Sequence, residues 1–160
     1  MDIYSYAMQM EKNGEIYYRE IAGKAKSKGI RNVLLMLADA EVKHYQIFEH
    51  MKRHEVVQPA DLAYLGKIKN IFVQMREGQE PLEVNGSQIV LYRKAQDIEK
   101  KTRDFYREKS AEVDEAQRTM FLKIADEEQK HYDILENIID VVTRPETWLE
   151  NPEWYHLEEY

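Results

Sequence analysis

Two copies of a short motif pair a carboxylate with an imidazole. Glu41 precedes His44 by three residues, and Glu128 precedes His131 by the same spacing. On an α-helix, residues three apart lie on one face, so each copy can direct both side chains toward one point. Carboxylates and imidazoles are ligands for divalent first-row metal ions. The two copies therefore predict a metal site built from two helices.

The residues around the two motifs are also repeated. The stretch ADAEVKHYQIFEHM (38–51) is matched 87 residues later by ADEEQKHYDILENI (125–138). A third match to the spacing, Glu153 with His156, lies in a proline-flanked tail with no apolar repeat around it. We therefore interpret the first two copies as parts of one site and the third as coincidental.

A longer duplication contains these motifs. At an offset of 88 residues, MEK (10–12) pairs with IEK (98–100), and YYRE (17–20) pairs with FYRE (105–108). Each half shows the three-and-four apolar spacing of two amphipathic helices. A helical hairpin cannot bury its apolar face alone, so we expect two hairpins to pack face to face as an all-α four-helix bundle.

The expected helices cover most of the chain. They are placed at residues 3–27, 30–55 and 61–76, with a second hairpin from residue 87 onward. Pro59 is expected to end the second helix, and the third is a short helix inside a crossover connection of about 30 residues. The bundle would form one domain over residues 1–142. Residues 143–160, which contain two tryptophans and two prolines, would form an arm packed on the bundle or on a partner subunit.

Length and composition are those of a single-domain soluble protein. A chain of 160 residues can bury roughly two-thirds of its unfolded surface. Its 23 basic and 30 acidic residues give a net charge of -7, which argues against nucleic acid or an anionic membrane as partner. The absence of cysteine excludes disulfides, thiolate zinc sites and iron–sulfur clusters within this chain. The N-terminus lacks signal-peptide features, so we expect a cytoplasmic protein.

Six duplicated polar residues that interrupt the apolar stripes are the candidate metal ligands. They are Glu11, Glu41, His44, Glu99, Glu128 and His131. Four carboxylates and two imidazoles suit two divalent ions, each with one terminal Glu and one His, and with Glu41 and Glu128 as bridges. Charge supports this hypothesis, because four buried carboxylates without partners would be costly and two divalent ions balance them.

Other polar residues near the motifs have simpler interpretations. Tyr18 and Tyr106 each follow a candidate Glu by seven residues, or two helical turns. They either donate hydrogen bonds to the ligand carboxylates or pack as ordinary core aromatics. Four acidic residues are expected to face solvent instead: Glu20, Asp39, Asp126 and Glu127.

The sequence resembles the rubrerythrin branch of the ferritin-like superfamily over roughly residues 3–142. The resemblance is carried by MEK (10–12) with Tyr18, LADAEVKH (37–44), its counterpart at 124–131, and Glu99 with Tyr106. It implies a ferritin-like bundle with a crossover connection. It also implies a non-haem diiron-carboxylate centre that reacts with hydrogen peroxide or dioxygen.

The sequence departs from the rubrerythrin pattern in two ways. Rubrerythrins have an additional Glu three residues after the third-helix Glu, which exchanges with a histidine ligand as the redox state changes, and here this position is Thr102. They also carry a rubredoxin domain that this chain lacks. The first departure leaves a more symmetric site of two His and four Glu. The second implies an external electron donor, either rubredoxin-like or a flavoprotein.

Three functional hypotheses follow. The first is a homodimeric redox enzyme of peroxidase type that reduces hydrogen peroxide, or dioxygen, at two iron ions. The alternative is an iron-binding or ferroxidase module for iron storage or delivery, which a hollow shell of subunits would favour. The third is a helical interaction protein with vestigial Glu and His residues. The ligand types do not distinguish iron from manganese, and zinc is a substitute.

Overall fold

The computed structural model describes residues 1–78 and 86–144, and no strand occurs among them. Their helices are α1 (Ile3–Lys24), α2 (Lys28–Lys52), α3 (Ala63–Glu77), α4 (Gly86–Lys109), the short 3-10 helix η1 (Ser110–Glu112) and α5 (Glu115–Thr143). The prediction of an all-α protein is confirmed. Residues 145–160 of the predicted C-terminal arm lie outside the described residues, so its packing and the domain boundary stay predictions.

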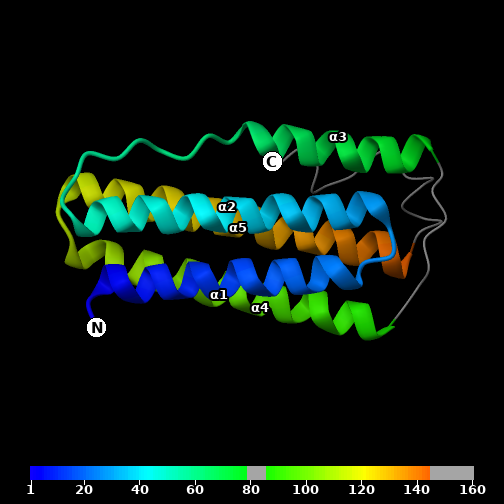
Figure 1. The fold of residues 1–160 in the computed structure, drawn as a ribbon, viewed down its shortest axis with the longest axis horizontal. Helices are drawn as coiled ribbons and strands as arrows, with labels where there is room; N and C mark the ends of the chain where they lie inside the picture. Colours follow the sequence, from blue (N-terminus) through cyan, green and yellow to red (C-terminus); the bar gives the residue numbers. More distant parts are fainter. Residues whose placement is uncertain (79–85, 145–160) are drawn as a thin grey trace.

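The long helices form two hairpins joined by a crossover (Figure 1). α1 packs most extensively on α2, and α4 on α5. Residues 53–62 run back along the outer side of α2 and lead into α3 (Figure 1). The chain thereby returns to the end of the bundle where α4 begins, so that α1 lies antiparallel to α4. Among the described helices, none combines the length and the apolar character needed to cross a membrane.

Local signals fix the ends of the helices. Three N-caps, Asp2, Ser27 and Asp114, each accept a hydrogen bond from the backbone N–H three residues later. The end of α2 differs from the prediction, because the helix stops at Lys52 rather than continuing to residue 55. The chain turns at His54, whose φ of 56° is left-handed. Pro59 therefore lies within the crossover and does not end the helix.

Apolar side chains fill the bundle in two separate clusters. One cluster includes Ile21, Leu34 and Ile138, and the other includes Phe48 and Phe121. Along each long helix, the candidate ligands lie between residues of the first cluster and residues of the second. The two clusters therefore close the middle of the bundle from both ends and exclude water from it.

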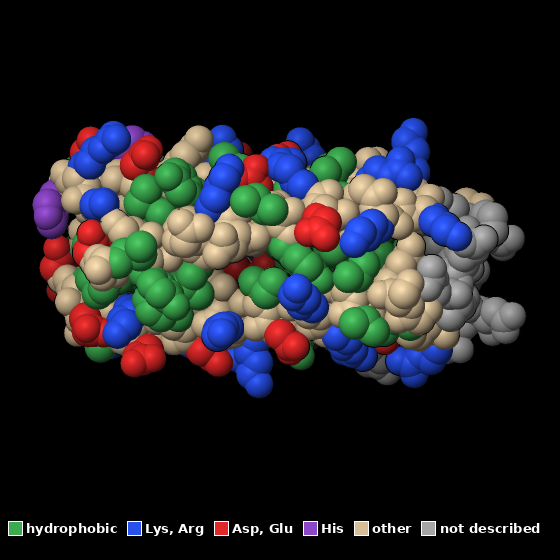
Figure 2. Space-filling view, turned by 60° about the horizontal axis from the view of Figure 1, so that its bottom comes forward, with side chains coloured by type: hydrophobic (Ala, Val, Ile, Leu, Met, Phe, Trp, Pro, Cys, Tyr) green, Lys and Arg blue, Asp and Glu red, His purple; other side chains and the backbone are tan. Residues whose placement is uncertain are grey.

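The face formed by α1 and α4 carries hydrophobic side chains among its charged ones (Figure 2). Tyr6 and Ile16 of α1 are 48% and 54% exposed. The Tyr6 ring packs against Phe105 of α4, with ring centroids 4.9 Å apart. Single exposed apolar residues are normal on a monomer, whereas several on one face are typical of a contact surface.

Replacing Phe121 by Ala should destabilise the fold strongly. The ring is fully buried and contacts Phe48 and Tyr106 at centroid distances of 5.3 and 5.9 Å. Loss of a buried phenyl ring typically costs about 3–5 kcal/mol. The neighbouring residue Leu122 is 37% exposed, so Leu122→Ala should cost less than about 1 kcal/mol. Urea unfolding of both variants measures the difference, and equal losses would contradict the described core.

Candidate metal centre

The structure brings all six candidate ligands together at the middle of the bundle. All six are buried, with relative exposures between 0% and 3%. They form two overlapping groups, and within each group the ligand atoms lie within 4.8 Å of one another. The groups are Glu11, Glu41, His44 and Glu128, and Glu41, Glu99, Glu128 and His131. Only Glu41 and Glu128 belong to both, which is the arrangement expected of two bridging carboxylates.

The buried atoms without hydrogen-bond partners show that these residues fit metal ions. Each of the six residues has such an atom on the side where they meet: Glu11 Oε2, Glu41 Oε1, His44 Nδ1, Glu99 Oε2, Glu128 Oε1 and His131 Nδ1, and His44 Nε2 is a further one on the outer side. His44 Nδ1 lies 2.7 Å from Glu128 Oε1 and 3.4 Å from Glu11 Oε2. Unpartnered buried oxygen and nitrogen atoms are rare in folded proteins, and a shared cation satisfies all of them.

Two tyrosines, one on α1 and one on α4, each donate a hydrogen bond to a candidate ligand carboxylate on the other of these two helices. Tyr18 of α1 donates a hydrogen bond to Glu99 Oε1 at 2.5 Å, and Tyr106 of α4 donates one to Glu11 Oε1 at 2.7 Å. Burial, together with the nearby carboxylates, raises the pKa of both phenols well above the usual value. Both tyrosines therefore remain protonated and act as donors, and Tyr106 also packs against Phe48.

Gly14 and Thr102 occupy matching positions in the two halves and adapt α1 and α4 to the site. A Cβ atom at Gly14 would lie 3.4 Å from the Glu41 carboxyl carbon. The glycine therefore lets α1 approach this carboxylate closely. Thr102 is buried and donates its hydroxyl to the Ile98 carbonyl oxygen at 2.8 Å. Its side chain thus bonds to its own helix.

Protons are unevenly distributed over the metal-free site. Burial, then the charges of Glu11 and the other carboxylates, raise the pKa of Glu41 and Glu128 well above 4.5. Burial opposes ionisation of Glu99, but its interactions with Glu128 and His131 lower its pKa to about 2. Without metal, the core therefore keeps some of its carboxyl groups protonated.

His44 is held between carboxylates on both sides of its ring. Burial alone would lower its pKa, but Glu127 and Glu11 together raise it well above 6.5. The contacting atoms are Nε2 on the outer side, 2.9 Å from Glu127 Oε2, and Nδ1 on the inner side. Metal at the Nδ1 side would replace the proton there.

Glu127 is buried, so the prediction that it faces solvent was wrong. Glu20, Asp39 and Asp126 are exposed, as predicted. Glu127 is only 4% exposed because the crossover residues before α3 cover this side of α5. The one sequence signal was its position four residues before His131, which places both on the same helix face.

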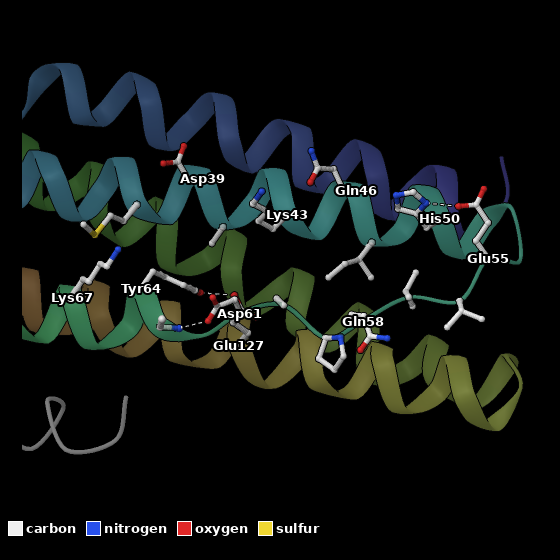
Figure 3. A pocket seen from close by; sticks show the side chains of 18 residues that line it. Asp39, Lys43, Gln46, His50, Glu55, Gln58, Asp61, Tyr64, Lys67 and Glu127 are labelled. Carbon is white, nitrogen blue, oxygen red and sulfur yellow. Dashed lines mark hydrogen bonds and ion pairs between the residues drawn. The ribbon is translucent and has the colours of Figure 1, made fainter.

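Tyr64, at the start of α3, is the second residue that the sequence did not reveal. Its hydroxyl donates a hydrogen bond to Glu127 Oε2 and lies 2.6 Å from His131 Nε2. Both Tyr64 and Glu127 line a cavity of about 750 Å³ between α2 and the crossover (Figure 3). The cavity therefore reaches the two residues that contact the imidazoles, whereas neither histidine and none of the four candidate ligand carboxylates lines it.

Comparison with known protein families agrees with this geometry. The sequence matches the rubrerythrin family over residues 2–139, which includes all four long bundle helices up to the last turn of α5. The chain belongs to the rubrerythrin family. Comparisons with curated proteins and with solved structures gave no match. The family and the buried Glu and His residues together support a metal-binding site, as predicted for this rubrerythrin-family chain.

The metal-free protein should lose stability as pH rises. Glu41 and Glu128 have folded-state pKa values above 4.5, so the folded state holds protons that the unfolded chain releases above that pH. The two carboxyl groups therefore contribute fully to the free energy of unfolding below pH 4.5, and this contribution is lost as pH rises. The contribution of His44 to the same free energy is lost in the same way above pH 6.5. Metal binding requires deprotonated ligands, so ferrous iron should stabilise the fold increasingly as pH rises.

Anaerobic thermal unfolding between about pH 5 and pH 8, with and without two equivalents of ferrous iron, measures how the unfolding midpoint and its increase on iron binding each change with pH. We expect the metal-free midpoint to fall with pH and the difference caused by iron to grow. A midpoint that iron leaves unchanged at all pH values would contradict a metal site in the core.

The two shared carboxylates should matter for both metal ions. Glu41→Ala or Glu128→Ala should reduce the metal content toward zero, because each residue belongs to both ligand groups. Glu11→Ala or Glu99→Ala should leave about one ion per chain, because each residue belongs to one group. Metal-to-protein ratios of the four purified variants decide this. Equal losses in all four would show that no carboxylate bridges.

Proposed function

We propose that this chain is a diiron-carboxylate redox protein that reduces hydrogen peroxide with electrons from an external donor. The observation that carries the proposal is the set of buried atoms without hydrogen-bond partners, at least one from each of two His and four Glu, in a chain of the rubrerythrin family. Two ferrous ions would be neutralised by the four carboxylates and would supply the two electrons. Each hydrogen peroxide takes up two electrons and two protons and gives two molecules of water.

The protein's own residues would position the ligands and keep the site dry. Glu11 and His44 would terminate one position, and Glu99 and His131 the other. The apolar clusters at both ends of the site exclude bulk water, which strengthens the electrostatic interactions inside. The hydrogen bonds from the two protonated tyrosines hold the terminal carboxylates in place. This arrangement favours a ligand set that changes little between the two oxidation states.

Thr102 supports a fixed ligand set. Its hydroxyl bonds to the Ile98 carbonyl oxygen, and it offers no carboxylate that could follow a change in metal charge. Both histidines would therefore stay bound in both redox states. Such a site suits the two-electron reduction of an O–O bond that is already partly reduced, and this choice of oxidant rests partly on analogy with the family.

The proposal also includes the partners. The donor would be a rubredoxin-like protein or a flavoprotein in the cytoplasm, and neither nucleic acid nor a membrane would take part. The hydrophobic side chains on the face of α1 and α4 support a homodimer (Figure 2). Iron is favoured over manganese by the family, and the ligand chemistry suits both metals.

Hydrogen peroxide should oxidise the diferrous protein faster than dioxygen does. Stopped-flow absorbance of anaerobic protein mixed with each oxidant at equal concentration measures the two rates. We expect the peroxide rate to be at least about tenfold higher, which corresponds to about 1.4 kcal/mol in activation free energy. Should dioxygen react as fast or faster, the alternative function as a ferroxidase for iron storage or delivery replaces the peroxidase.

Thr102→Glu serves as the matched control for this prediction. The variant returns the carboxylate found at this position in rubrerythrins, so one histidine should become redox-dependent in its coordination. Spectroscopy of the oxidised and reduced forms detects this change. A wild-type protein whose histidine coordination already changes with oxidation state would contradict the fixed ligand set.

A further inference from the structure

Two residues outside the duplicated ligand set contact the outer side of the two histidines. We propose that Glu127 and Tyr64 are positioning residues that make the two metal positions unequal, although the ligands themselves are duplicated. The His44 position would have an imidazole that faces a carboxylate, and the His131 position one that faces a phenol. This inference rests on the proposed metal centre and goes beyond it, since the ligand set alone predicts two equal positions.

Hydrogen-bonding capacity fixes the direction of these contacts. Tyr64 has one hydroxyl proton, which it donates to the Glu127 carboxylate. Its oxygen lies 2.6 Å from His131 Nε2, so that nitrogen must carry the proton and donate it to the phenol. Nδ1 of His131 is then the ring nitrogen with a free lone pair, and it points toward Glu41 and Glu99 at 3.4 Å.

His44 has the same orientation but a different partner. Its Nε2 lies 2.9 Å from Glu127 Oε2, although the approach is not well aligned for a hydrogen bond. The same carboxylate oxygen is 3.8 Å from His131 Nε2, too far for a hydrogen bond. A single carboxylate therefore contacts one imidazole directly and the other only through Tyr64.

The inequality arises where the duplication ends. At the offset of 87 residues, the residue that matches Glu127 is Ala40, which has no polar side chain. Tyr64 belongs to α3, which has no counterpart after the second hairpin among the described residues. The first half therefore cannot supply a second carboxylate, and the crossover supplies a phenol on one side only.

A carboxylate partner makes a metal-bound imidazole a stronger donor than a neutral partner does. The His44 position should therefore bind a divalent ion more tightly than the His131 position. Removing the phenol should weaken only the His131 position, whereas neutralising the carboxylate should weaken the His44 position most. Loss of such a partner commonly lowers metal affinity by about 10- to 100-fold.

Titration with Co²⁺, followed by its visible absorption, tests the inequality without turnover. Wild-type protein should bind two ions in two resolved steps. In Tyr64→Phe the gap between the two affinities should widen by about tenfold or more, and in Glu127→Gln it should narrow. A purely structural role would weaken both steps together in both variants. Tyr17→Phe is the matched control, because this hydroxyl bonds to the Leu91 carbonyl oxygen away from the site.

NMR of the cobalt-loaded protein provides a second, independent measurement. A histidine bound through Nδ1 keeps its Nε2 proton, so wild type should show two exchangeable, paramagnetically shifted imidazole N–H signals. Tyr64→Phe should accelerate solvent exchange of one signal, because its N–H loses the phenol that accepts its hydrogen bond, and should leave the other unchanged. Equal changes in both signals, or none in either, would overturn the proposal.

The outcomes also separate this inference from the proposed function. A wild-type chain that binds no Co²⁺ would overturn the metal centre and this inference with it. Slow oxidation by hydrogen peroxide, in a protein that binds two Co²⁺ ions with unequal affinity, would overturn only the peroxidase activity. Two equal affinities that neither variant separates would overturn only the inference.

Discussion

Four carboxylates lie at the middle of a helical bundle whose surrounding core is apolar, and their burial constrains everything around them. A buried carboxylate without a partner is strongly unfavourable, so each one needs a cation, a proton or a hydrogen-bond donor. The tyrosines, the histidines and the raised pKa values of Glu41 and Glu128 are all responses to this requirement. Divalent ions held by these residues, as proposed, would satisfy it most completely, and at least one buried atom without a hydrogen-bond partner comes from each of the six candidate ligands.

The sequence revealed the parts of the fold that repeat. Because Glu41 with His44 recurs at the same helical spacing as Glu128 with His131, both the helical bundle and the meeting of the six candidate ligands in its core could be predicted from the duplication. The burial of Glu127 could not be predicted from the sequence, because it depends on how the crossover residues lie over α5. Tyr64 was equally hidden, since a tyrosine at the start of a short amphipathic helix carries no signal of the histidine that it will contact.

The end of α2 is the remaining difference between the prediction and the structure. Proline ends helices reliably, so Pro59 was the obvious terminator in the sequence. The structure ends the helix earlier, at Lys52, by a left-handed turn at His54 that nothing in the residue types required. The early end leaves a longer extended segment, and this segment has the length to bring Tyr64 over the histidines.

Tyr18 and Tyr106 make the hydrogen bonding of each hairpin's candidate ligands depend on the other hairpin. Each hairpin carries two Glu, one His and one Tyr toward the centre, and its tyrosine bonds to a carboxylate of the other hairpin. Neither hairpin can therefore complete the hydrogen bonding of its own ligands, whereas two identical hairpins could complete each other's. The bundle is thus organised like a symmetric dimer of hairpins whose two copies lie in one chain.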